Sequence, residues 1–374
     1  MARPHAPGLE VDMHRTASDR IGVGVIGAST VNPGWAMTAH IPAIQALPDF
    51  ELRAVSTSNR ASADAAAEAL RTPAFANPEA LILHPGVDLV VVSVRVPYHH
   101  ALTAAALEAG KMVFTEWPLG RTLEEAEDLD ARAQRAGMRT VIGLQARFAP
   151  AVQEARDLIA RGYVGEVLST NLVGAGMVWG DRIARAHAYA VEADHGVTLM
   201  TVTMMHALEA MNFVLGDFTT VNAAAAVRRP LVRVIEDGSP LQATAFDHIA
   251  LGGTLQNGAI ASLLFRGAAS RGDNLRWEIT GTEGDLVLTA ANGNLQVADL
   301  TLRGGRGEQT SVAPISTTPP DGVGANTLRQ YAALARDLRE NTRLVPDFAH
   351  AVTRHRLLAA IEKAARTGVR QEVV

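Results

Sequence analysis

The chain contains no cysteine, and this absence removes several kinds of chemistry at once. Disulfide bonds, thiolate metal sites and a cysteine nucleophile are all excluded. The twelve histidines do not predict a metal site either, because their spacing is poor: His99 and His100 are adjacent and face different sides of a helix, and His350 and His355 do not share a helix face. No Gly-x-Ser-x-Gly motif is present, so nothing favours a serine hydrolase.

A large excess of positive charge and long uninterrupted apolar runs are also missing. The net charge of −5 excludes the pervasive basicity of a general nucleic-acid binder. Charged residues, glycine or proline interrupt every long apolar stretch, so no membrane span is expected. Met1–Asp19 is polar and lacks the apolar run of a signal peptide, so residues 1–19 are expected to form a flexible tail. We therefore expect a cytoplasmic protein that binds neither nucleic acid nor membrane.

The 374 residues, of which 48% are hydrophobic, are enough for two domains. In residues 20–147, apolar runs alternate with helical segments. The expected strands are Ile21–Ile26, Glu51–Ser56, Asp88–Val94, Met112–Thr115 and Arg139–Gly143. The expected helices are Ala61–Leu70, Tyr98–Ala109 and one that opens at the capping box Thr122-Leu-Glu-Glu125. This alternation predicts an α/β domain with a Rossmann-type parallel sheet.

Residues 148–346 follow a different pattern, which predicts an α+β domain with a large open, mostly antiparallel sheet. Strands dominate from Phe218 to Leu302, after helices at Ala151–Arg161 and Val197–Leu215. A loop is expected over Arg303–Asn326, then helices at Thr327–Glu340 and Phe348–Arg366, with residues 347–374 packing back on the body. An uncovered apolar sheet face would otherwise meet water, so we expect a homodimer or a homotetramer.

The end of the first strand carries features of a dinucleotide site. Gly27 fits the first glycine of a Rossmann fingerprint, Ser29 replaces the second, and Gly34 lies late in a lengthened loop before Trp35. After the second strand no carboxylate is found, and the hydroxyl of Ser58 and the guanidinium of Arg60 suit a 2′-phosphate. This favours NADP(H), with NAD(H) as the alternative. Ser58 or Asn59 could instead cap the next helix, with Arg60 solvated.

Several motifs together resemble the Gfo/Idh/MocA family of sugar and polyol oxidoreductases over about residues 20–370. They are the glycine loop with His40-Ile-Pro42, Pro97-Tyr-His99, Ala106–Lys111, Thr115-Glu-Trp-Pro118 and Gly162–Glu166. Within the family, Gly34-Trp35-Ala36, Glu116-Trp117 and Gln145-Ala-Arg147 most resemble the branch of the fungal galactose-regulon repressor. That branch keeps the oxidoreductase fold but acts as a nucleotide- and partner-binding regulator. The resemblance implies that Val96, His99, Glu116 and Gln145 lie beside the cofactor, together with Gly27, Ser29, Gly34, Trp35, Ser58 and Arg60.

Two departures from the family concern the catalytic groups. Trp117 stands where active members have a lysine near the nicotinamide, and Val202 stands where they have an aspartate four residues before a histidine. That histidine is matched by His206. Catalysis would then rest on His206, Glu116 and Trp117, with help from Tyr189 or His187, and with Asp194 and His195 as further candidates. His206 could equally be a buried structural histidine beside Glu209.

A polar and aromatic stretch lies where the family's substrate loop is expected. Trp179 and Arg182, followed by Arg185–Tyr189, suit a sugar-like ligand, although a solvated loop would have the same composition. Arg147 is expected to line the interdomain cleft and bind substrate, along with His206. Two functions follow: an NADP(H)-dependent oxidoreductase acting on a sugar- or polyol-like molecule, or a catalytically silent nucleotide-sensing regulator on the same fold.

Overall fold

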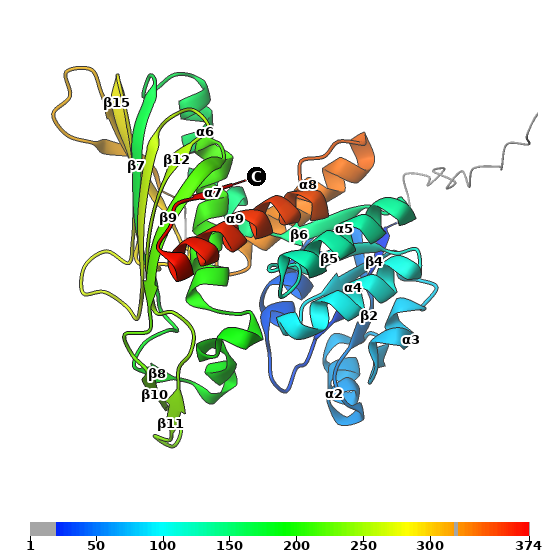
Figure 1. The fold of residues 1–374 in the computed structure, drawn as a ribbon. Coiled ribbons are helices and arrows are strands. Elements are labelled where there is room, and N and C mark those ends of the chain that lie inside the picture. The colour runs from blue at the N-terminus through cyan, green and yellow to red at the C-terminus, as the bar shows by residue number, and fades with distance from the viewer. Residues whose placement is uncertain (1–19, 318–320, 374) are drawn as a thin grey trace, which may run out of the picture.

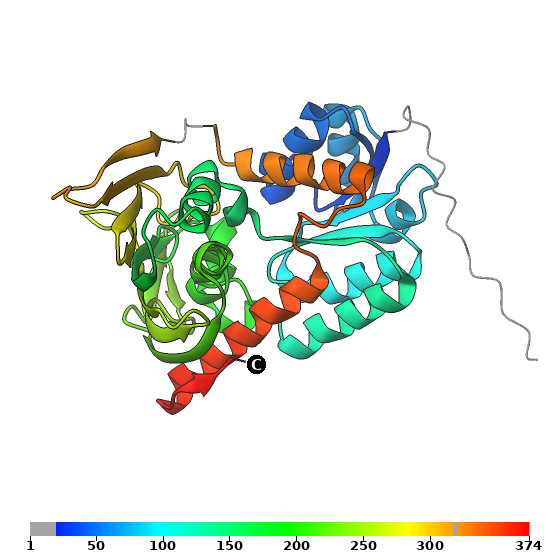
Figure 2. The ribbon, with the colours of Figure 1, turned by 90° about the horizontal axis from the view of Figure 1, so that it is seen from above.

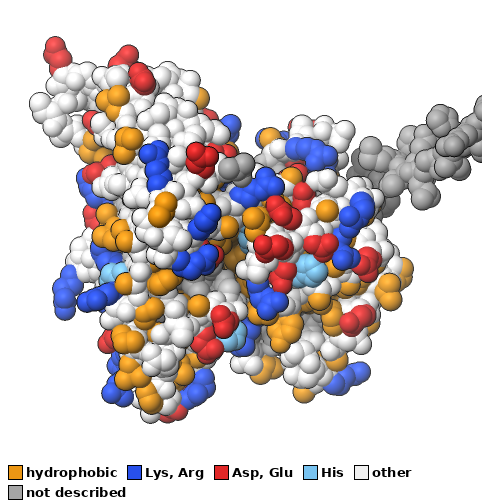
Figure 3. Space-filling model, viewed as in Figure 1, with side chains coloured by type: hydrophobic (Ala, Val, Ile, Leu, Met, Phe, Trp, Pro, Cys, Tyr) orange, Lys and Arg blue, Asp and Glu red, His pale blue; other side chains and the backbone are white. Residues whose placement is uncertain are grey.

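The computed structural model describes residues 20–317 and 321–373, so the tail expected at residues 1–19 lies outside the described residues. The described chain forms two bodies, an α/β body and a body built on a large sheet, and helix α9 (Phe348–Thr367) runs between them (Figure 1). In the space-filling view of the same side, acidic and basic side chains are interspersed rather than gathered into one patch (Figure 3).

The first body is a Rossmann-type sheet of six parallel strands in the order β3-β2-β1-β4-β5-β6. The strands are β1 (Ile21–Ile26), β2 (Phe50–Ser56), β3 (Ala74–Phe75), β4 (Leu89–Val92), β5 (Met112–Glu116) and β6 (Thr140–Gly143). Its helices are η1 (Ala36–His40), α1 (Ile41–Ala46), α2 (Arg60–Leu70), α3 (Pro78–Ile82), η2 (Val96–Tyr98), α4 (His99–Glu108) and α5 (Leu123–Ala136). In such a sheet, ligands bind at the carboxyl ends of the strands where the order reverses, here between β1 and β4.

Local sequence explains where these helices begin and end. The Thr122 side chain accepts a hydrogen bond from the Glu125 N–H and caps α5, which ends at Gly137 with a φ of 64°. Asn59 caps α2 in the same way through the Ser62 N–H. The parallel sheet and most of its predicted boundaries are therefore confirmed, while β3 and α3 were not predicted.

The second body is built on a nine-stranded sheet in the order β17-β16-β15-β14-β7-β13-β12-β9-β18, and only the β7–β13 pair is parallel. Its strands are β7 (Val167–Gly176), β9 (Phe218–Ala226), β12 (His248–Leu255), β13 (Ile260–Gly267), β14 (Leu275–Gly281), β15 (Gly284–Ala290), β16 (Thr301–Arg306), β17 (Ala313–Thr317) and β18 (Gln371–Glu372). A small second sheet joins β8 (Arg182–Ile183), β10 (Leu231–Val234) and β11 (Pro240–Gln242). Helical segments of this body are η3 (Gln145–Phe148), α6 (Pro150–Ala160), η4 (Arg185–Val191), η5 (Ala193–His195), η6 (Leu199–Met204) and α7 (Met205–Leu215).

One face of the large sheet is covered and the other is open. Residues of α6, α7 and α9 share one hydrophobic core with the inner face of the sheet and with α4 and α5. On β13 the buried residues Ala261, Leu263 and Phe265 alternate with the exposed residues Ile260 and Leu264. The open, mostly antiparallel sheet that the sequence predicts is therefore confirmed.

Three parts of the chain differ from the sequence-based expectations. The predicted single helix at 197–215 is two segments, because its first part, η6, is a π-helix. The loop predicted at 303–326 contains the end of β16 and all of β17. Helix α8 (Ala325–Glu340) begins after Gly324, because the Asn326 side chain does not cap it but donates to the Gln296 carbonyl.

Helix α8 also lies on the first body, although the expected domain boundary assigned residues 148–346 to the second. Tyr331, Leu334 and Ala335 share a core with Val23 and Phe50. Figure 2 shows α8 alongside the N-terminal helices. Helix α9, in turn, contacts α5 of the first body and β9 of the second.

In the described ranges, no helix is long and apolar enough to cross a membrane. Nor do those ranges bring together three or more His, Asp or Glu side chains in an arrangement that could hold a metal ion.

Candidate functional site

The turn after β1 has the geometry that a dinucleotide-binding loop requires. Gly27 has a φ of 99°, and a Cβ there would lie 2.2 Å from the Ser93 carbonyl oxygen. Its N–H donates to the Ser56 carbonyl at 2.9 Å. A glycine is therefore needed where the chain leaves the sheet, and this turn together with the strand order fits a dinucleotide.

The rest of the glycine loop is more exposed. Ser29 accepts a hydrogen bond from the Asn32 N–H at 3.2 Å. Gly34 is exposed, and a Cβ there would meet nothing within 4 Å. Trp35 is half-buried at the start of η1, and its indole N–H has no partner among the described residues.

The segment after β2 gives mixed support for a 2′-phosphate site. Ser58 and Arg60 are exposed, as such a site requires, but the Arg60 Nε donates to Asp64 at 2.8 Å. This pair follows the i,i+4 spacing of α2. Arg60 is thus neither free nor simply solvated, while Asn59 serves as the cap of α2.

The loops after β4 and β5 are tied together by His99. Its Nδ1 lies 2.8 Å from the Pro118 carbonyl oxygen and its Nε2 lies 3.0 Å from that of Val94. Burial lowers the pKa of His99, and the two carbonyls oppose this effect. Val96 is also buried, and a Cβ at Gly196 would lie 3.2 Å from the Val96 Cγ1. Both residues therefore shape the loop around the expected nicotinamide position.

Trp117, which the resemblance places where the family has a lysine, has only one hydrogen-bond donor, and that donor is already used. The indole N–H donates to the Thr201 carbonyl at 2.6 Å, and the ring lies against His355 with centroids 4.6 Å apart. The side chain is buried, and it joins β5 to η6 and α9. In this arrangement Trp117 has no polar group left to offer a substrate.

Glu116, next to Trp117, is buried at the end of β5 but keeps 11% of its side-chain surface exposed. Its Oε1 receives two hydrogen bonds, from His40 Nε2 at 2.9 Å and from Gln145 Nε2 at 2.7 Å. Gln145 is fully buried, and its own oxygen accepts from Gln296. Both ends of the Gln145 amide are thus bound inside the protein, and its expected place beside the cofactor stays a prediction.

His206 lies at the start of α7 and is buried. Neither ring nitrogen makes a hydrogen bond to a described residue, and Nδ1 is fully buried without a partner. Burial lowers the pKa of His206 to about 4, and the negative charge of Glu209 only partly opposes this. The ring is therefore neutral at physiological pH. It is not the satisfied structural histidine that the sequence left open as an alternative.

Arg147, for which the sequence predicts a substrate-binding role, is held in a buried ion cluster. Its guanidinium contacts the Glu209 carboxylate and lies 4.9 Å from the centre of the Phe213 ring. The other Glu209 oxygen lies 2.9 Å from His350 Nε2 and 3.4 Å from Arg354 Nε. Burial alone would raise the pKa of Glu209, but these neighbours lower it well below its usual value. The cluster joins η3, α7 and α9.

The predicted substrate segment forms part of the small subdomain around β8. Trp179 donates its indole N–H to the Ala190 carbonyl at 3.0 Å, while Arg182 and His187 are exposed. Tyr189 is half-buried, and the Arg95 guanidinium lies 4.6 Å from the centre of its ring. Since Arg95 follows β4, the structure brings Tyr189 to the edge of the Rossmann sheet.

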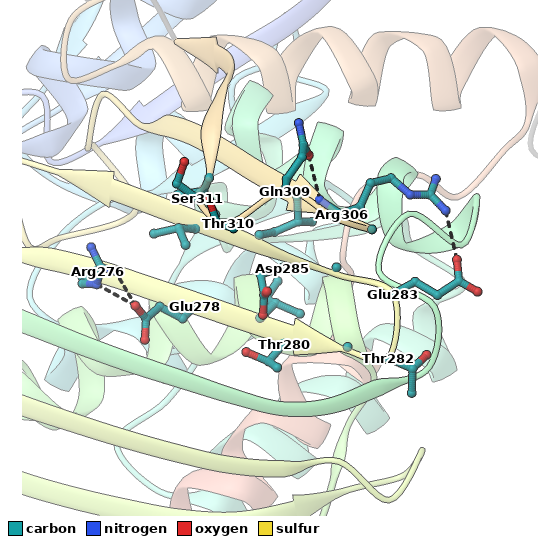
Figure 4. A pocket seen from close by; sticks show the side chains of 18 residues that line it. Arg276, Glu278, Thr280, Thr282, Glu283, Asp285, Arg306, Gln309, Thr310 and Ser311 are labelled. Carbon is teal, nitrogen blue, oxygen red and sulfur yellow. Dashed lines mark hydrogen bonds and ion pairs between the residues drawn. The ribbon is translucent and has the colours of Figure 1, made fainter.

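A cavity of about 820 Å³ lies away from this site. It is an open groove on β14, β15 and β16, and four of its charged residues form two pairs, Arg276 with Glu278 and Arg306 with Glu283 (Figure 4). None of the predicted site residues lines it. We therefore place the functional site between the two bodies, at the carboxyl ends of the parallel strands.

Several residues of the site were missed by the sequence analysis. His40 belongs to the His40-Ile-Pro42 motif, and its spacing after Gly34 is the sequence signal that could have placed it at the site. Tyr331, Gln296 and Arg95 come from elements far apart in the sequence, and only the tertiary structure brings them to the site.

Two family models match the chain. One describes the oxidoreductase family with an NAD-binding Rossmann fold, Gfo/Idh/MocA, and matches residues 21–144. The other describes the C-terminal domain of Gal80p and matches residues 150–290.

Individual proteins show the same two kinds of similarity. The chain is 29% identical to the dehydrogenase aclE of Aspergillus oryzae, over 94% of this chain and 98% of that protein. It is 31% identical to a 1,5-anhydro-D-fructose reductase of Ensifer adhaerens, over 76% of this chain and 80% of that protein. Among solved structures, the super-repressor mutant of Gal80p from Saccharomyces cerevisiae superimposes with a TM-score of 0.87 at 26% identity, covering 95% of this chain and 98% of that one.

Proposed function

Since the chain belongs to the Gfo/Idh/MocA family of oxidoreductases, we propose that it transfers hydride between a nicotinamide dinucleotide and an alcohol carbon of a sugar- or polyol-like molecule. The bound dinucleotide would supply the hydride acceptor or donor. The protein must then orient the substrate and exchange a proton with its hydroxyl group.

The observation that carries this proposal is the unpartnered, neutral imidazole of His206. A buried polar group without a partner costs free energy, so such a group is rarely kept without a use. On the same helix, Glu209 has partners on both carboxylate oxygens. In the oxidation direction, His206 would take the proton of the substrate hydroxyl and become an imidazolium. Tyr189 is the better-placed helper, because it reaches the loop after β4.

We propose NADP(H) as the cofactor, with NAD(H) as the alternative. The support is the absence of a carboxylate after β2 and the two exposed donors Ser58 and Arg60. The exposed Arg60–Asp64 pair contributes little to stability, so Arg60 can exchange Asp64 for a phosphate at small cost. Tighter binding of NADPH than NADH, with the difference lost in Arg60→Ala, is the expected result.

The activity test mixes the protein with NADP⁺ or NADPH and a panel of sugars, polyols and their keto forms. We expect a substrate-dependent change in nicotinamide absorbance. His206→Asn should reduce turnover about 10²–10⁴-fold while dinucleotide binding is retained. His100→Asn is the matched control, because His100 pairs with Asp128 between α4 and α5 and away from the cleft. Full turnover in His206→Asn would contradict the role given to His206.

A second candidate function is nucleotide sensing without chemistry. The observation that favours it is Trp117, whose single donor is bound to the Thr201 carbonyl where active relatives have a lysine. The similarity to Gal80p over nearly the whole chain is consistent with it. Tight dinucleotide binding without turnover on any substrate of the panel, even at stoichiometric protein, would favour this function.

We further propose that two copies associate through the open face of the large sheet. Ile260 and Leu264 on β13 are 59% and 41% exposed, and their neighbours across the strand pairs are Thr254 and Ala250. Apolar side chains exposed on an open sheet face are typical of a protein interface. Sedimentation should show a dimer or a larger assembly that Leu264→Arg dissociates. An unchanged mass in that variant would contradict this interface.

A further inference from the structure

A chain of buried hydrogen bonds converges on one carboxylate oxygen at the end of β5. The Tyr331 hydroxyl lies 2.9 Å from His40 Nδ1, and His40 Nε2 lies 2.9 Å from Glu116 Oε1. From the other side, Gln296 donates to Gln145 at 2.7 Å, and Gln145 donates to the same Oε1 at 2.7 Å. The chain thus joins α8, η1, β5, η3 and the segment before β16.

The identity of the groups sets the direction of the hydrogen bonds. An ionised carboxylate only accepts, so His40 Nε2 must carry the proton that it shares with Glu116. A neutral imidazole then has an unprotonated Nδ1, which accepts from the Tyr331 hydroxyl. All the donors therefore point toward Glu116 Oε1. This orients the carboxylate without an arginine or lysine beside it among the described residues.

The surroundings leave the carboxylate little freedom to move. His40, Tyr331 and Gln145 are fully buried, and the rings of Phe114 and Tyr331 both contact His40 edge-on. Gly143 on the neighbouring strand makes room, because a Cβ there would lie 2.4 Å from Glu116 Oε1. A buried polar network with all its partners satisfied is rigid.

The second carboxylate oxygen of Glu116, Oε2, is not held by the protein in this way. Oε2 accepts no hydrogen bond from any described residue, and it is not among the fully buried atoms that lack a partner. The 11% of the side chain that remains exposed is thus open to solvent or to a ligand. The protein thus holds Oε1 of Glu116 through two hydrogen bonds and leaves Oε2 without one from a described residue.

We propose that Tyr331 and His40 are positioning residues that hold Glu116 so that its free oxygen accepts a hydrogen bond from an N–H or O–H donor of the bound ligand. This rests on the proposed function for the identity of the ligand. The donor is either the carboxamide N–H of the nicotinamide or a hydroxyl of the sugar-like substrate. The test distinguishes these two sources.

The first measurement is the protonation pattern of His40 by ¹⁵N NMR of the imidazole. We expect a neutral ring with the proton on Nε2 in the wild-type protein. Tyr331→Phe removes the hydroxyl that donates to Nδ1, and the Nδ1 resonance should shift. A ring that is protonated on both nitrogens, or on Nδ1 alone, would overturn the proposed orientation.

The second measurement compares binding of NADPH with binding of its 3-acetylpyridine analogue, in which a methyl group replaces the carboxamide NH₂. If the carboxamide is the donor, Tyr331→Phe and Glu116→Gln should weaken NADPH binding about 3- to 10-fold and leave binding of the analogue unchanged. If the substrate hydroxyl is the donor, dinucleotide binding should stay constant and KM for the substrate should rise in both variants. Tyr163→Phe is the matched control, because Tyr163 lies against Arg306 of β16 and not at the ends of the parallel strands.

The outcomes separate this proposal from the proposed function. If the wild-type protein binds no dinucleotide, the proposed function fails and the positioning role fails with it. If the wild-type protein binds dinucleotide and turns over substrate, while Tyr331→Phe and Glu116→Gln change neither binding nor KM, the positioning role alone is wrong.

Discussion

Two buried glutamates lie near the junction of the two bodies, and they are held in opposite ways. Glu209 on α7 has partners on both oxygens, with Arg147 on one and His350 and Arg354 on the other. Glu116 at the end of β5 accepts hydrogen bonds from His40 and Gln145, both on a single oxygen, and no arginine or lysine pairs with it among the described residues. A carboxylate with both oxygens bound to buried cations serves to fix elements to each other. A carboxylate fixed through one oxygen can still bind something from outside.

The largest effect on stability is expected when the ion cluster around Glu209 is broken. Glu209→Gln removes the negative charge and leaves Arg147 and Arg354 buried without it, which should cost about 3–5 kcal/mol of stability. Urea unfolding of the variant, compared with the wild-type protein, measures this. A loss below about 1 kcal/mol would show that the cluster relaxes or hydrates freely.

A smaller effect is expected from restoring the family lysine at the tryptophan beside Glu116. Trp117→Lys would lose the hydrogen bond to the Thr201 carbonyl and the contact with His355, and it would place an ammonium group among buried residues. We expect a loss of about 2–4 kcal/mol and no gain in turnover. Trp117→Phe keeps most of the packing and serves as the control. A gain in turnover at unchanged stability would mean that the indole only blocks a working site.

The pH dependence of stability should distinguish the Glu209 ion cluster from the two buried histidines His206 and His355. Burial lowers the pKa of His206 and of His355 to about 4, against 6.5 in the unfolded chain. The unfolded state therefore binds more protons between pH 6.5 and 4, and stability should rise with pH across that window by roughly 1 kcal/mol per pH unit for each histidine.

The pKa of Glu209 is lowered from 4.5, so its contribution is present above pH 4.5 and is lost as pH falls further. Unfolding curves from pH 3 to 7 should show both stages in the wild-type protein. In Glu209→Gln, only the loss of stability below pH 4.5 should disappear. In His355→Phe, the slope of stability against pH between pH 4 and 6.5 should fall. An equal slope at all pH values would contradict the buried, neutral state of the two histidines.

The smallest effect on stability is expected at Glu116. Because no buried arginine pairs with Glu116 among the described residues, Glu116→Gln leaves no guanidinium without its counter-charge and should cost about 1 kcal/mol. The same urea experiment as for Glu209→Gln measures it. If the two substitutions cost the same, the contrast between the two glutamates is wrong.

The sequence predicted the elements whose signals are local. Thr122 and Gly137 mark the ends of α5, and Asp347 and Gly368 mark those of α9, because caps act within one helical turn. The buried run Ile21–Ile26 and the turn at Gly27 were predicted for the same reason. Each of these features depends on residues only a few positions apart.

The parts that were missed depend on contacts between distant residues. Arg147 has the composition of a ligand-binding side chain, and only the fold shows that Glu209 neutralises it. The π-helix η6 has the apolar pattern of an ordinary helix, so periodicity alone did not distinguish the two. Tyr331 carried no signal, because its partner His40 is far away in the sequence.

The position of α8 affects how the protein can be made. The first body begins at β1, yet part of its core is filled by Tyr331 and Leu334, which lie beyond the whole second body in the chain. Domains usually fold as units during synthesis, the N-terminal one first. Here the ribosome must add the large sheet before it can supply the helix that covers one face of the first. The Rossmann body should therefore reach its final state only when synthesis is nearly finished, and residues 20–147 expressed alone should expose an apolar surface.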